Sequence, residues 1–355
     1  MTLSLYRKLA DMAVAGLEIQ AGQFVEIRGD AAMWNCIEAV SLAVERAKAV
    51  PCLNVTSIAH EAERIRTLPI DWLRSPSPFL LDLDTRADAA IVIERYWRPL
   101  TESCPSQRLE AWNRAVGVLL RQQESGRVPN CMIAHPGAVP QDELLVPRGD
   151  IHRAMENSID VDMIELDRRV RSVKQIIENG SVLDIRTPNG GRLECQLGGR
   201  PVFENDGRLS DSFVLNLPFG AISFTVPETT VQGSICIERW RNVHDLTLTF
   251  VDGRISGISA ANSPKSFTNF IATHSGHRDR ISHVGIGVNP GIHSPTGNIG
   301  VDECKSGMLF FALGENRYLG GLNESTLNMD LTCPGATVFV GSRCIVRDGR
   351  LTLAS

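Results

Sequence analysis

The sequence predicts two domains of different class. An α/β domain with a mainly parallel sheet is expected over residues 1–150, and a β-rich α+β domain over residues 151–355. Three observations carry this prediction. The 355 residues exceed the length of an average single domain, which is about 150 residues. Helix-like and strand-like patterns alternate in the first half, whereas the second half consists of short alternating runs separated by turn dipeptides.

Helices and strands alternate along the first domain. Apolar residues at helical spacing predict helices over residues 5–17 and 34–49. Strands are predicted over residues 24–28 and 52–55, directly after these helices. The unbroken apolar run of residues 89–93 suits a parallel strand that is buried on both faces. This βαβ order predicts a right-handed, doubly wound domain.

The second half has the pattern of antiparallel sheets. A helix over about residues 151–180 is expected to join the two halves. Residues 246–250 and 255–258 alternate on either side of an Asp-Gly pair, which is the signature of a hairpin. Dipeptides of the hairpin type occur four times after residue 175: Asn189-Gly190, Asp206-Gly207, Asp252-Gly253 and Asp348-Gly349.

Composition excludes several classes of protein. The chain carries 36 Lys and Arg against 41 Asp and Glu, a formal net charge of -5, so no nucleic-acid partner is expected. No apolar window is long enough to span a membrane, and the start lacks the basic-then-apolar order of a secretion signal. The nine cysteines are scattered and form no Cys-x-x-Cys pair, which indicates reduced thiols and a cytoplasmic protein.

Common catalytic motifs are absent from the sequence. Residues 28–32 follow the first predicted strand without the G-x-G-x-x-G of a dinucleotide-binding loop, so the first domain is interpreted as a scaffold. A nucleophile elbow, a Walker loop and a His-Glu-x-x-His pair are also missing. The chemistry is therefore expected among the histidines and carboxylates of the second half.

His283 is the most informative histidine. It stands near the start of residues 282–290, where glycines alternate with apolar residues. Glycine weakens a strand unless another group approaches its backbone closely, so the imidazole is expected to face that group. The alternative is a buried histidine bonded to the backbone. His274, His277 and His293 lie nearby in polar or loop-like sequence, where a solvated side chain is the alternative to a functional one.

Asn328 and Asp330 form a second candidate group, on a predicted strand over residues 326–331. Side chains two positions apart on a strand project to the same face. One imidazole and one carboxylate on neighbouring strands would supply part of a facial metal site with open positions. A hydrogen-bonded Asn/Asp pair that caps a turn is the alternative. Tyr318 precedes this strand and can donate a hydrogen bond or a phenolic proton.

Motifs along nearly the whole chain carry a family resemblance. They are Lys8 to Arg28, Asn216-Leu217-Pro218-Phe219-Gly220 with Thr225 to Gly233, Ser282-His283-Val284-Gly285-Ile286-Gly287-Val288-Asn289-Pro290, Val301 to Gly314, and Gly320 to Asp330. Together they resemble the thermophilic metallo-aminopeptidase family (aminopeptidase T and its relatives). The resemblance implies an α/β N-terminal domain, a β-rich C-terminal domain that carries the site, and a homodimer or larger homo-oligomer.

The two-metal site of that family is not retained. Family peptidases hold two metals with two glutamates, a tyrosine, two histidines and an aspartate. The resemblance places Ala221 and His283 at the glutamate positions, Phe310 and Asn328 at the histidine positions, Asp330 at the aspartate, and Tyr318 at the tyrosine. Two adjacent divalent cations need several carboxylates to offset their repulsion, and both glutamates are gone. A dinuclear aminopeptidase is therefore not expected.

The site pattern is more similar to the 2,5-dihydroxypyridine 5,6-dioxygenase branch of these relatives. That branch has Ser-His-Ile-Gly where this chain has Ser282-His283-Val284-Gly285, and its histidine binds a single Fe(II). It also lacks the first glutamate, and its His-x-Asp pair aligns with Asn328 and Asp330. The resemblance implies one divalent metal per chain, with Fe(II) favoured and Zn or Mn as alternatives.

The resemblance also implies roles for individual residues. His283 and Asp330 would be metal ligands, and Asn328 would be a weaker neutral donor or a bystander. Because an amide oxygen is less basic than an imidazole, the affinity for Fe(II) should be lower than with two histidines. Tyr318 and His293 are the candidate catalytic partners for proton transfer.

Three functions are compatible with these residues. The first is a mononuclear metal enzyme that acts on a small polar or N-heterocyclic aromatic substrate, in the manner of 2,5-dihydroxypyridine dioxygenase. The second is a metal-dependent aminopeptidase or amide hydrolase of the same family, in which one metal activates water. The third is a non-enzymatic relative whose metal site has decayed.

Overall fold

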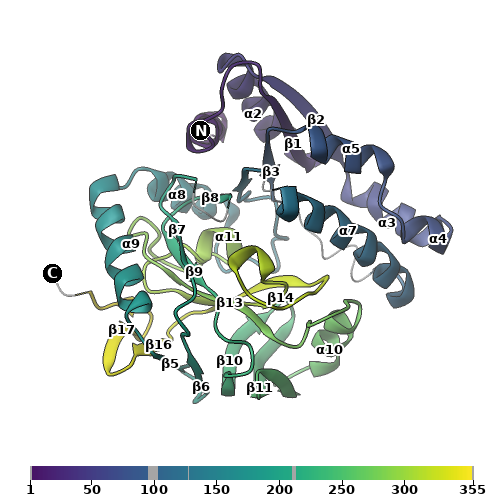
Figure 1. Ribbon diagram of the computed structural model, residues 1–355. Helices are drawn as coiled ribbons and strands as arrows, with labels where there is room; N and C mark the ends of the chain where they lie inside the picture. The colour runs from purple at the N-terminus through teal and green to yellow at the C-terminus, as the bar shows by residue number, and fades with distance from the viewer. Residues whose placement is uncertain (1, 95–102, 127, 210–212, 354–355) are drawn as a thin grey trace. The chain divides into compact units, whose positions relative to one another are not determined.

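A computed structural model describes residues 2–94, 103–126, 128–209 and 213–353 (Figure 1). The chain forms two compact units, the first made of Met1–Glu156 with Gly207–Pro218 and the second of Asn157–Asp206 with Phe219–Ser355. Residues 207–218 thus return to the first unit, whereas the sequence analysis placed them in the domain over residues 151–355.

The first unit is built on a parallel five-stranded sheet, sheet A, in the order β2-β1-β3-β4-β8. The predicted α/β class with a parallel sheet is confirmed. The central strand β3 is buried along nearly its whole length, as its apolar run predicted. The strands of this sheet are β1 (Phe24–Asp30), β2 (Val50–Thr56), β3 (Ala89–Ile93), β4 (Asn130–Ile133) and β8 (Val214–Leu217).

Helices of the first unit bury the apolar faces that their spacing predicted. Helix α1 (Thr2–Gly16) packs against α2 (Trp34–Arg46) and contacts β4 and β8, and α2 contacts β1, β2 and β3. Leu5 and Leu9 of α1 are almost fully buried. Further helices among the described residues of this unit are η1 (Ala31–Met33), α3 (Ile58–Thr67), α4 (Ile70–Leu73), α5 (Pro78–Arg86) and α7 (Ser106–Gly126), and α7 packs against α3, α4 and α5.

The segment over about residues 151–180 is helical, as expected, and it is divided into two helices. Helix α8 spans Arg148–Ile159, and α9 spans Met163–Glu178. The Asp162 carboxylate accepts hydrogen bonds from the backbone N–H of Ile164 at 2.9 Å and of Glu165 at 3.4 Å. This N-cap satisfies donors that a new helix leaves unpaired, so a second helix starts there.

The second unit contains two antiparallel sheets, which confirms the predicted β-rich class. Sheet B has the order β12-β11-β10-β6-β5-β16-β17-β18, and sheet C has the order β15-β14-β13-β9-β7. The strands of sheet B are β5 (Val182–Arg186), β6 (Arg192–Gln196), β10 (Gln232–Trp240), β11 (Val243–Val251), β12 (Arg254–Ser259), β16 (Thr337–Val340), β17 (Arg343–Arg347) and β18 (Arg350–Leu351).

Sheet C is the smaller of the two, and α9 packs against its strands β7 and β9. Its strands are β7 (Val202–Asn205), β9 (Ala221–Phe224), β13 (Ile281–Gly287), β14 (Leu309–Gly314) and β15 (Asn328–Cys333). The short helices α10 (Pro264–Ala272), α11 (Ile299–Asp302) and η2 (Arg317–Leu319) lie between strands along the chain. Helix α10 contacts β11 and β12 of sheet B.

Three of the four predicted hairpin dipeptides lie in hairpins. Asn189-Gly190 joins β5 to β6, Asp252-Gly253 joins β11 to β12, and Asp348-Gly349 joins β17 to β18. Asp252 and Gly253 both have positive φ angles, as a type I′ turn requires. The hairpin expected at Asp206-Gly207 is wrong, because the chain passes there from β7 of sheet C to β8 of sheet A.

The cysteines are unpaired, as their scattered positions in the sequence predicted. All nine cysteines are free, and most are buried. Burial raises the pKa of the Cys36 thiol to about 12. Within the described residues, none of the helices is both long enough and apolar enough to pass through a bilayer.

Strand β13 is approached closely by an aromatic ring, as its glycines predicted. A Cβ atom added to Gly285 would lie 2.0 Å from Cζ of Phe310 on the neighbouring strand β14. Phe310 is itself buried, so its ring has little room to move. The glycine is therefore needed at this position.

Replacing Gly285 by alanine is expected to lower the free energy of unfolding by about 1–3 kcal/mol, because the added methyl overpacks the sheet against the Phe310 ring. Gly257→Ala in β12 is the matched control, since its added Cβ would lie 3.5 Å from Thr249 in ordinary contact. Urea unfolding of both variants measures the difference. Equal stability of the two variants would contradict the close approach.

Candidate functional site

The predicted metal-site residues lie on one face of sheet C. Strand β14 pairs with β15, and the register places Ala312 opposite Asp330 and Gly314 opposite Asn328. Residues opposite one another in an antiparallel ladder project to the same face. Asn328 and Asp330 therefore share a face, as their spacing predicted, although their strand runs over 328–333 instead of 326–331.

A bulge in β13 turns His283 toward that face. The ladder pairs Ile281 with Leu313 and then Val284 with Phe311, so Ser282 and His283 together oppose Ala312 alone. Bulges of this kind re-aim a side chain. The imidazole extends across β14, where Ala312 presents only a methyl group, and its Nε2 lies 3.1 Å from Oδ1 of Asp330.

The imidazole of His283 is held at its second nitrogen as well. Nδ1 lies 3.1 Å from the hydroxyl oxygen of Ser282, and that hydroxyl donates to the backbone carbonyl of Glu315. The Phe310 ring packs edge-on, with its centroid 6.1 Å from the imidazole centroid. His283 is buried, but its ring contacts a carboxylate and a hydroxyl. The alternative of a histidine bonded to the backbone does not describe it.

The His283–Asp330 pair fits adjacent ligand positions of one divalent metal. Nitrogen and oxygen ligands at about 2.1 Å from a metal, set at right angles, are about 3 Å apart. The two atoms are 3.1 Å apart. Within the described part of the chain, no group of three or more His, Cys, Asp and Glu side chains could hold a metal. Asn328 shares the face of Asp330 and carries an amide oxygen.

Asn328 is joined to Tyr318, the other residue predicted for the site. The Asn328 side-chain Nδ2 lies 3.2 Å from the Tyr318 hydroxyl, to which it donates. Tyr318 belongs to the short helix η2, between β14 and β15. The structure thus brings together His283 with Asp330 and Asn328 with Tyr318, and Asp330 and Asn328 lie two residues apart on β15.

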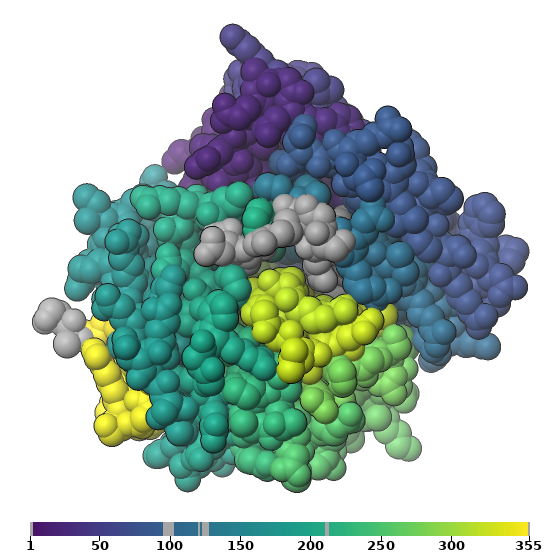
Figure 2. Space-filling model, viewed as in Figure 1, coloured from purple at the N-terminus to yellow at the C-terminus, as the bar shows by residue number. Residues whose placement is uncertain are grey.

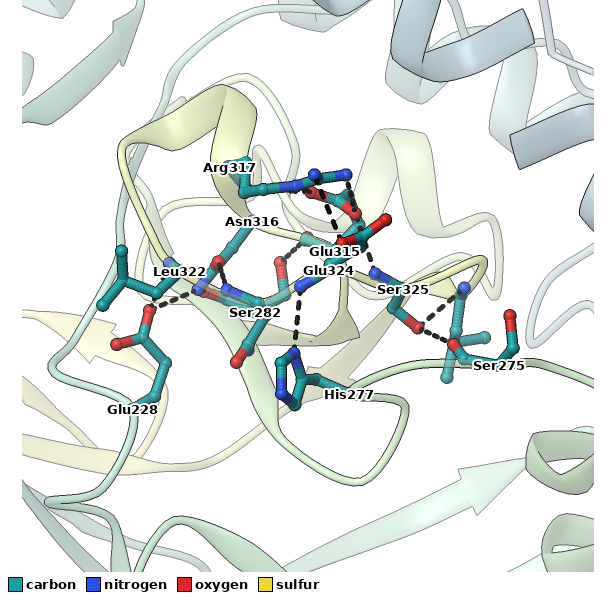
Figure 3. Close-up of polar contacts among 12 residues, drawn as sticks. Glu228, Ser275, His277, Ser282, Glu315, Asn316, Arg317, Leu322, Glu324 and Ser325 are labelled. Carbon is teal, nitrogen blue, oxygen red and sulfur yellow. Dashed lines mark hydrogen bonds and ion pairs between the residues drawn. The ribbon is translucent and has the colours of Figure 1, made fainter. Parts of the chain in front are cut away.

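The structure places His293 and His277 elsewhere. His293 lines an open pocket of about 540 Å³ together with Lys305 and Arg350. That pocket is not lined by any of the other candidate site residues, which are His283, Asn328, Asp330 and Tyr318. His277 Nδ1 accepts the backbone N–H of Glu324 at 3.0 Å, so it braces a loop (Figure 3). The structure therefore brings neither histidine to the His283–Asp330 pair.

The loop between β14 and β15, residues 315–327, carries Tyr318 and comes to the surface, where it is yellow-green in Figure 2. Its first residue anchors it. The Glu315 carboxylate accepts hydrogen bonds from Arg317 Nε at 2.8 Å and Nη2 at 3.1 Å, and from the backbone N–H of Ser325 at 2.8 Å (Figure 3). These contacts join the two ends of the loop.

A second buried carboxylate, Glu228, holds the middle of the same loop. It forms a bidentate pair with Arg200 at 2.8 and 2.7 Å. It also accepts the backbone N–H of Leu322 at 2.7 Å and the side-chain N–H of Asn316 at 3.2 Å (Figure 3). Burial opposes ionisation of Glu228, but these donors prevail and lower its pKa to about 2.

Several residues that shape the site were not found from the sequence. Ser282 and Ala312 owe their importance to the bulge, which no local pattern shows. The partners of Glu228 in the loop lie far along the chain. Glu315 has partners within ten residues, but no periodic pattern marks it. Among these residues, the sequence could have indicated only Ser282, since it directly precedes the candidate ligand His283.

Glu228→Gln is expected to lower the free energy of unfolding by about 1–3 kcal/mol at neutral pH, because the charged hydrogen bonds to Arg200 are lost. A carboxylate with a lowered pKa stabilises the fold above its unfolded value, about 4.5, and loses this effect as the pH falls through about 2. The difference between variant and parent should therefore shrink between pH 4.5 and 2.

Denaturation at a series of pH values measures this dependence. Glu324→Gln is the control, because the Glu324 side chain is 62% exposed and its ion pair with Arg317 is long, at 3.7 Å. It should change stability little at any pH. A constant difference between Glu228→Gln and the parent protein across the whole range would contradict the assigned role of Glu228.

The segment that contains these residues matches a known family. A family model described as NicX, 2,5-dihydroxypyridine 5,6-dioxygenase, matches residues 153–353. No curated protein matches the sequence. The solved 2,5-dihydroxypyridine dioxygenase from Pseudomonas putida KT2440 is 13% identical, with a TM-score of 0.62 and 100% of this chain and 99% of that chain covered.

Wild-type AmpT from Thermus thermophilus is similar as well. It is 16% identical, with a TM-score of 0.76, and 99% of each chain is covered. At such identities the two solved structures show the fold alone, and they confirm that the expected aminopeptidase T-like architecture extends over the whole chain.

Proposed function

This chain belongs to the 2,5-dihydroxypyridine 5,6-dioxygenase family, and we propose that it is a mononuclear metal-dependent enzyme acting on a small polar or N-heterocyclic aromatic substrate. The observation that carries the proposal is the His283–Asp330 pair, with 3.1 Å between Nε2 and Oδ1. The pair lies within the segment that the family model matches. One imidazole and one carboxylate with few further protein ligands suit a metal that keeps open positions.

A bound divalent metal, with Fe(II) favoured over Zn or Mn, would supply Lewis acidity and, as iron, a path for electrons from the substrate, which is oxidised, to O2, which is reduced. His283 and Asp330 would hold it. Asn328 lies on the same face as Asp330 and offers an amide oxygen as a weaker third ligand. These donors are uncharged apart from one carboxylate, which suits one cation and not two.

The remaining residues of the site orient groups and exclude water. Tyr318, hydrogen-bonded to Asn328, holds a proton at its phenol oxygen that general acid catalysis can use. Phe310 closes one side of the imidazole and is itself buried. His293 lines a different pocket, so no step is assigned to it.

Oxygen uptake with 2,5-dihydroxypyridine tests the proposal. Protein loaded anaerobically with Fe(II) should consume O2 when this substrate is added. Asp330→Ala should lose its metal and nearly all activity, because one of two strong ligands is gone. Thr332→Ala removes a side chain two residues further along β15, on the same face, and should keep both metal and activity.

Other outcomes would redirect the assignment. If iron-loaded protein takes up no O2 with this substrate, the dioxygenase function is wrong. Release of a chromogenic amine from aminoacyl anilides by Zn- or Mn-loaded protein would indicate the amide hydrolase instead. A melting temperature that no divalent metal changes would indicate a non-enzymatic relative.

Asn328→His is expected to tighten divalent-metal binding about tenfold, or about 1.4 kcal/mol, because imidazole is a better ligand for such metals than an amide oxygen. The new ring has room, since Gly314 lies opposite on β14. Calorimetric titration of the metal-free protein with Mn(II) measures the change. Asn328→Ala is the companion variant: weaker binding identifies Asn328 as a ligand, and unchanged binding identifies it as a bystander.

A further inference from the structure

We propose that the open pocket of about 540 Å³ lined by His293 is a binding site for the oxyanion of a small molecule, with Lys305 and Arg350 as the groups that bind it. The pocket belongs entirely to the second unit, and its lining comes from α9, from the segments after β13 and before β14, and from the β17–β18 hairpin. The proposed metal site lies elsewhere. The inference therefore goes beyond the proposed function and does not depend on a metal.

A tight contact between two turns brings the two cations to one pocket. Gly307 follows Lys305 by two residues and has a φ angle of 81°. A Cβ atom added to Gly307 would lie 2.3 Å from the carbonyl oxygen of Gly349 and 2.8 Å from Cα of Arg350. Glycine alone tolerates both the positive φ angle and this close approach. The backbone therefore holds the turn of Lys305 against the hairpin that carries Arg350.

The Lys305 ammonium is half-buried and has no counter-ion within the described part of the chain. Its hydrogen bond goes to the backbone carbonyl of Ser306 at 3.2 Å. Burial lowers the pKa of Lys305, the Asp302 carboxylate raises it, and the Arg350 guanidinium lowers it. The Asp302 carboxylate is directed to Thr296, whose backbone N–H and hydroxyl both donate to it at 2.7 Å. A partly buried charge in this situation is unfavourable until an anion pairs with it.

Arg350 is exposed and likewise forms no ion pair with any of the described residues. Among the described residues that line the pocket, the only acidic one is Asp348. It is bonded to Thr337, whose hydroxyl lies 3.2 Å from the carboxylate and 3.0 Å from the Asp348 backbone N–H. A third cation of the lining, Arg169, is neutralised by Glu165 at 2.8 Å. The two cations of the proposed site are therefore the ones left for a ligand.

The lining also defines the class of ligand. An oxyanion between an ammonium and a guanidinium neutralises both and accepts charge-assisted hydrogen bonds from them. The Ser306 hydroxyl and the His293 imidazole line the same pocket and, within the described residues, have no hydrogen-bond partner, so they offer further donors. Pro290, Ile292 and Pro295 add apolar surface. The volume suits a small molecule, and a carboxylate and a phosphate share the required chemistry.

Calorimetric titration of the full-length protein without added metal tests the proposal, with inorganic phosphate and benzoate as separate probes at constant ionic strength. At least one probe should bind, with one site per chain. Arg350→Met and Lys305→Met should each lower the affinity for that probe about tenfold or more, because hydrogen bonds to a charged group are lost. Tighter binding of phosphate identifies a phosphate ligand, and tighter binding of benzoate identifies a carboxylate on an apolar body.

Two control variants separate the pocket from other effects. Arg343→Met removes an exposed cation from β17 outside the lining, so it should leave the affinity nearly unchanged. Asp330→Ala removes a proposed metal ligand and should also leave it unchanged. The proposal is overturned if neither probe binds the parent protein. It is equally overturned if Arg343→Met weakens binding as much as Arg350→Met, because the effect is then one of net charge.

Melting temperatures distinguish lost binding from lost folding. Lys305→Met replaces a half-buried charge by an apolar chain, so it should not lower the melting temperature in buffer without the probes. A saturating concentration of the bound probe should raise the melting temperature of the parent protein, because the ligand binds only the folded state. This rise should be absent from Arg350→Met. An equal rise in both proteins would contradict the assignment of Arg350.

Discussion

The hydrogen bond from the Ser282 hydroxyl to the Glu315 carbonyl joins the bulge of β13 to the end of β14, and the geometry of the site depends on it. A bulge leaves backbone and side-chain groups outside the regular ladder, and buried polar groups must find other partners. Ser282 finds them in Glu315 and Asn316. The bulge is thereby held in one conformation, and the imidazole that it carries is directed across β14 to Asp330.

The need to pair buried polar groups also determines the conformation of the loop over residues 315–327. Two buried carboxylates, Glu228 and Glu315, are each paired with an arginine and accept backbone N–H groups from this loop. Burying a charge is costly unless it is paired and hydrogen-bonded, so these groups determine where the loop can lie. Because the loop carries Tyr318, the ion pairs also set the position of the phenol relative to Asn328.

Fold and chemistry are separable in this molecule. Its architecture is similar both to a solved dioxygenase and to a solved protein named AmpT, so the fold alone does not select an activity. The donor set is more selective. One carboxylate oxygen and one imidazole nitrogen 3.1 Å apart match two adjacent ligand positions of a single divalent cation, whereas a dinuclear centre requires more negative charge than this pair offers.

Local patterns in the sequence predicted much of the fold. The parallel and antiparallel halves, the helices α1 and α2, three hairpins and the shared face of Asn328 and Asp330 all follow from spacing within a few residues. The close approach at Gly285 was also foreseeable, because glycines in a strand indicate a neighbouring group. The break before α9 was missed, although the capping residue Asp162 was visible.

Only the tertiary structure decided how these pieces meet. The return of residues 207–218 to sheet A, the bulge opposite Ala312 and the contact between His283 and Asp330 join segments that are distant in the chain. Strand register and hydrogen-bond direction are set by packing and by the need to pair buried polar groups, and neither leaves a periodic trace in the sequence. The sequence by itself therefore determined which residues could form the site, and the folded structure decided which of them touch.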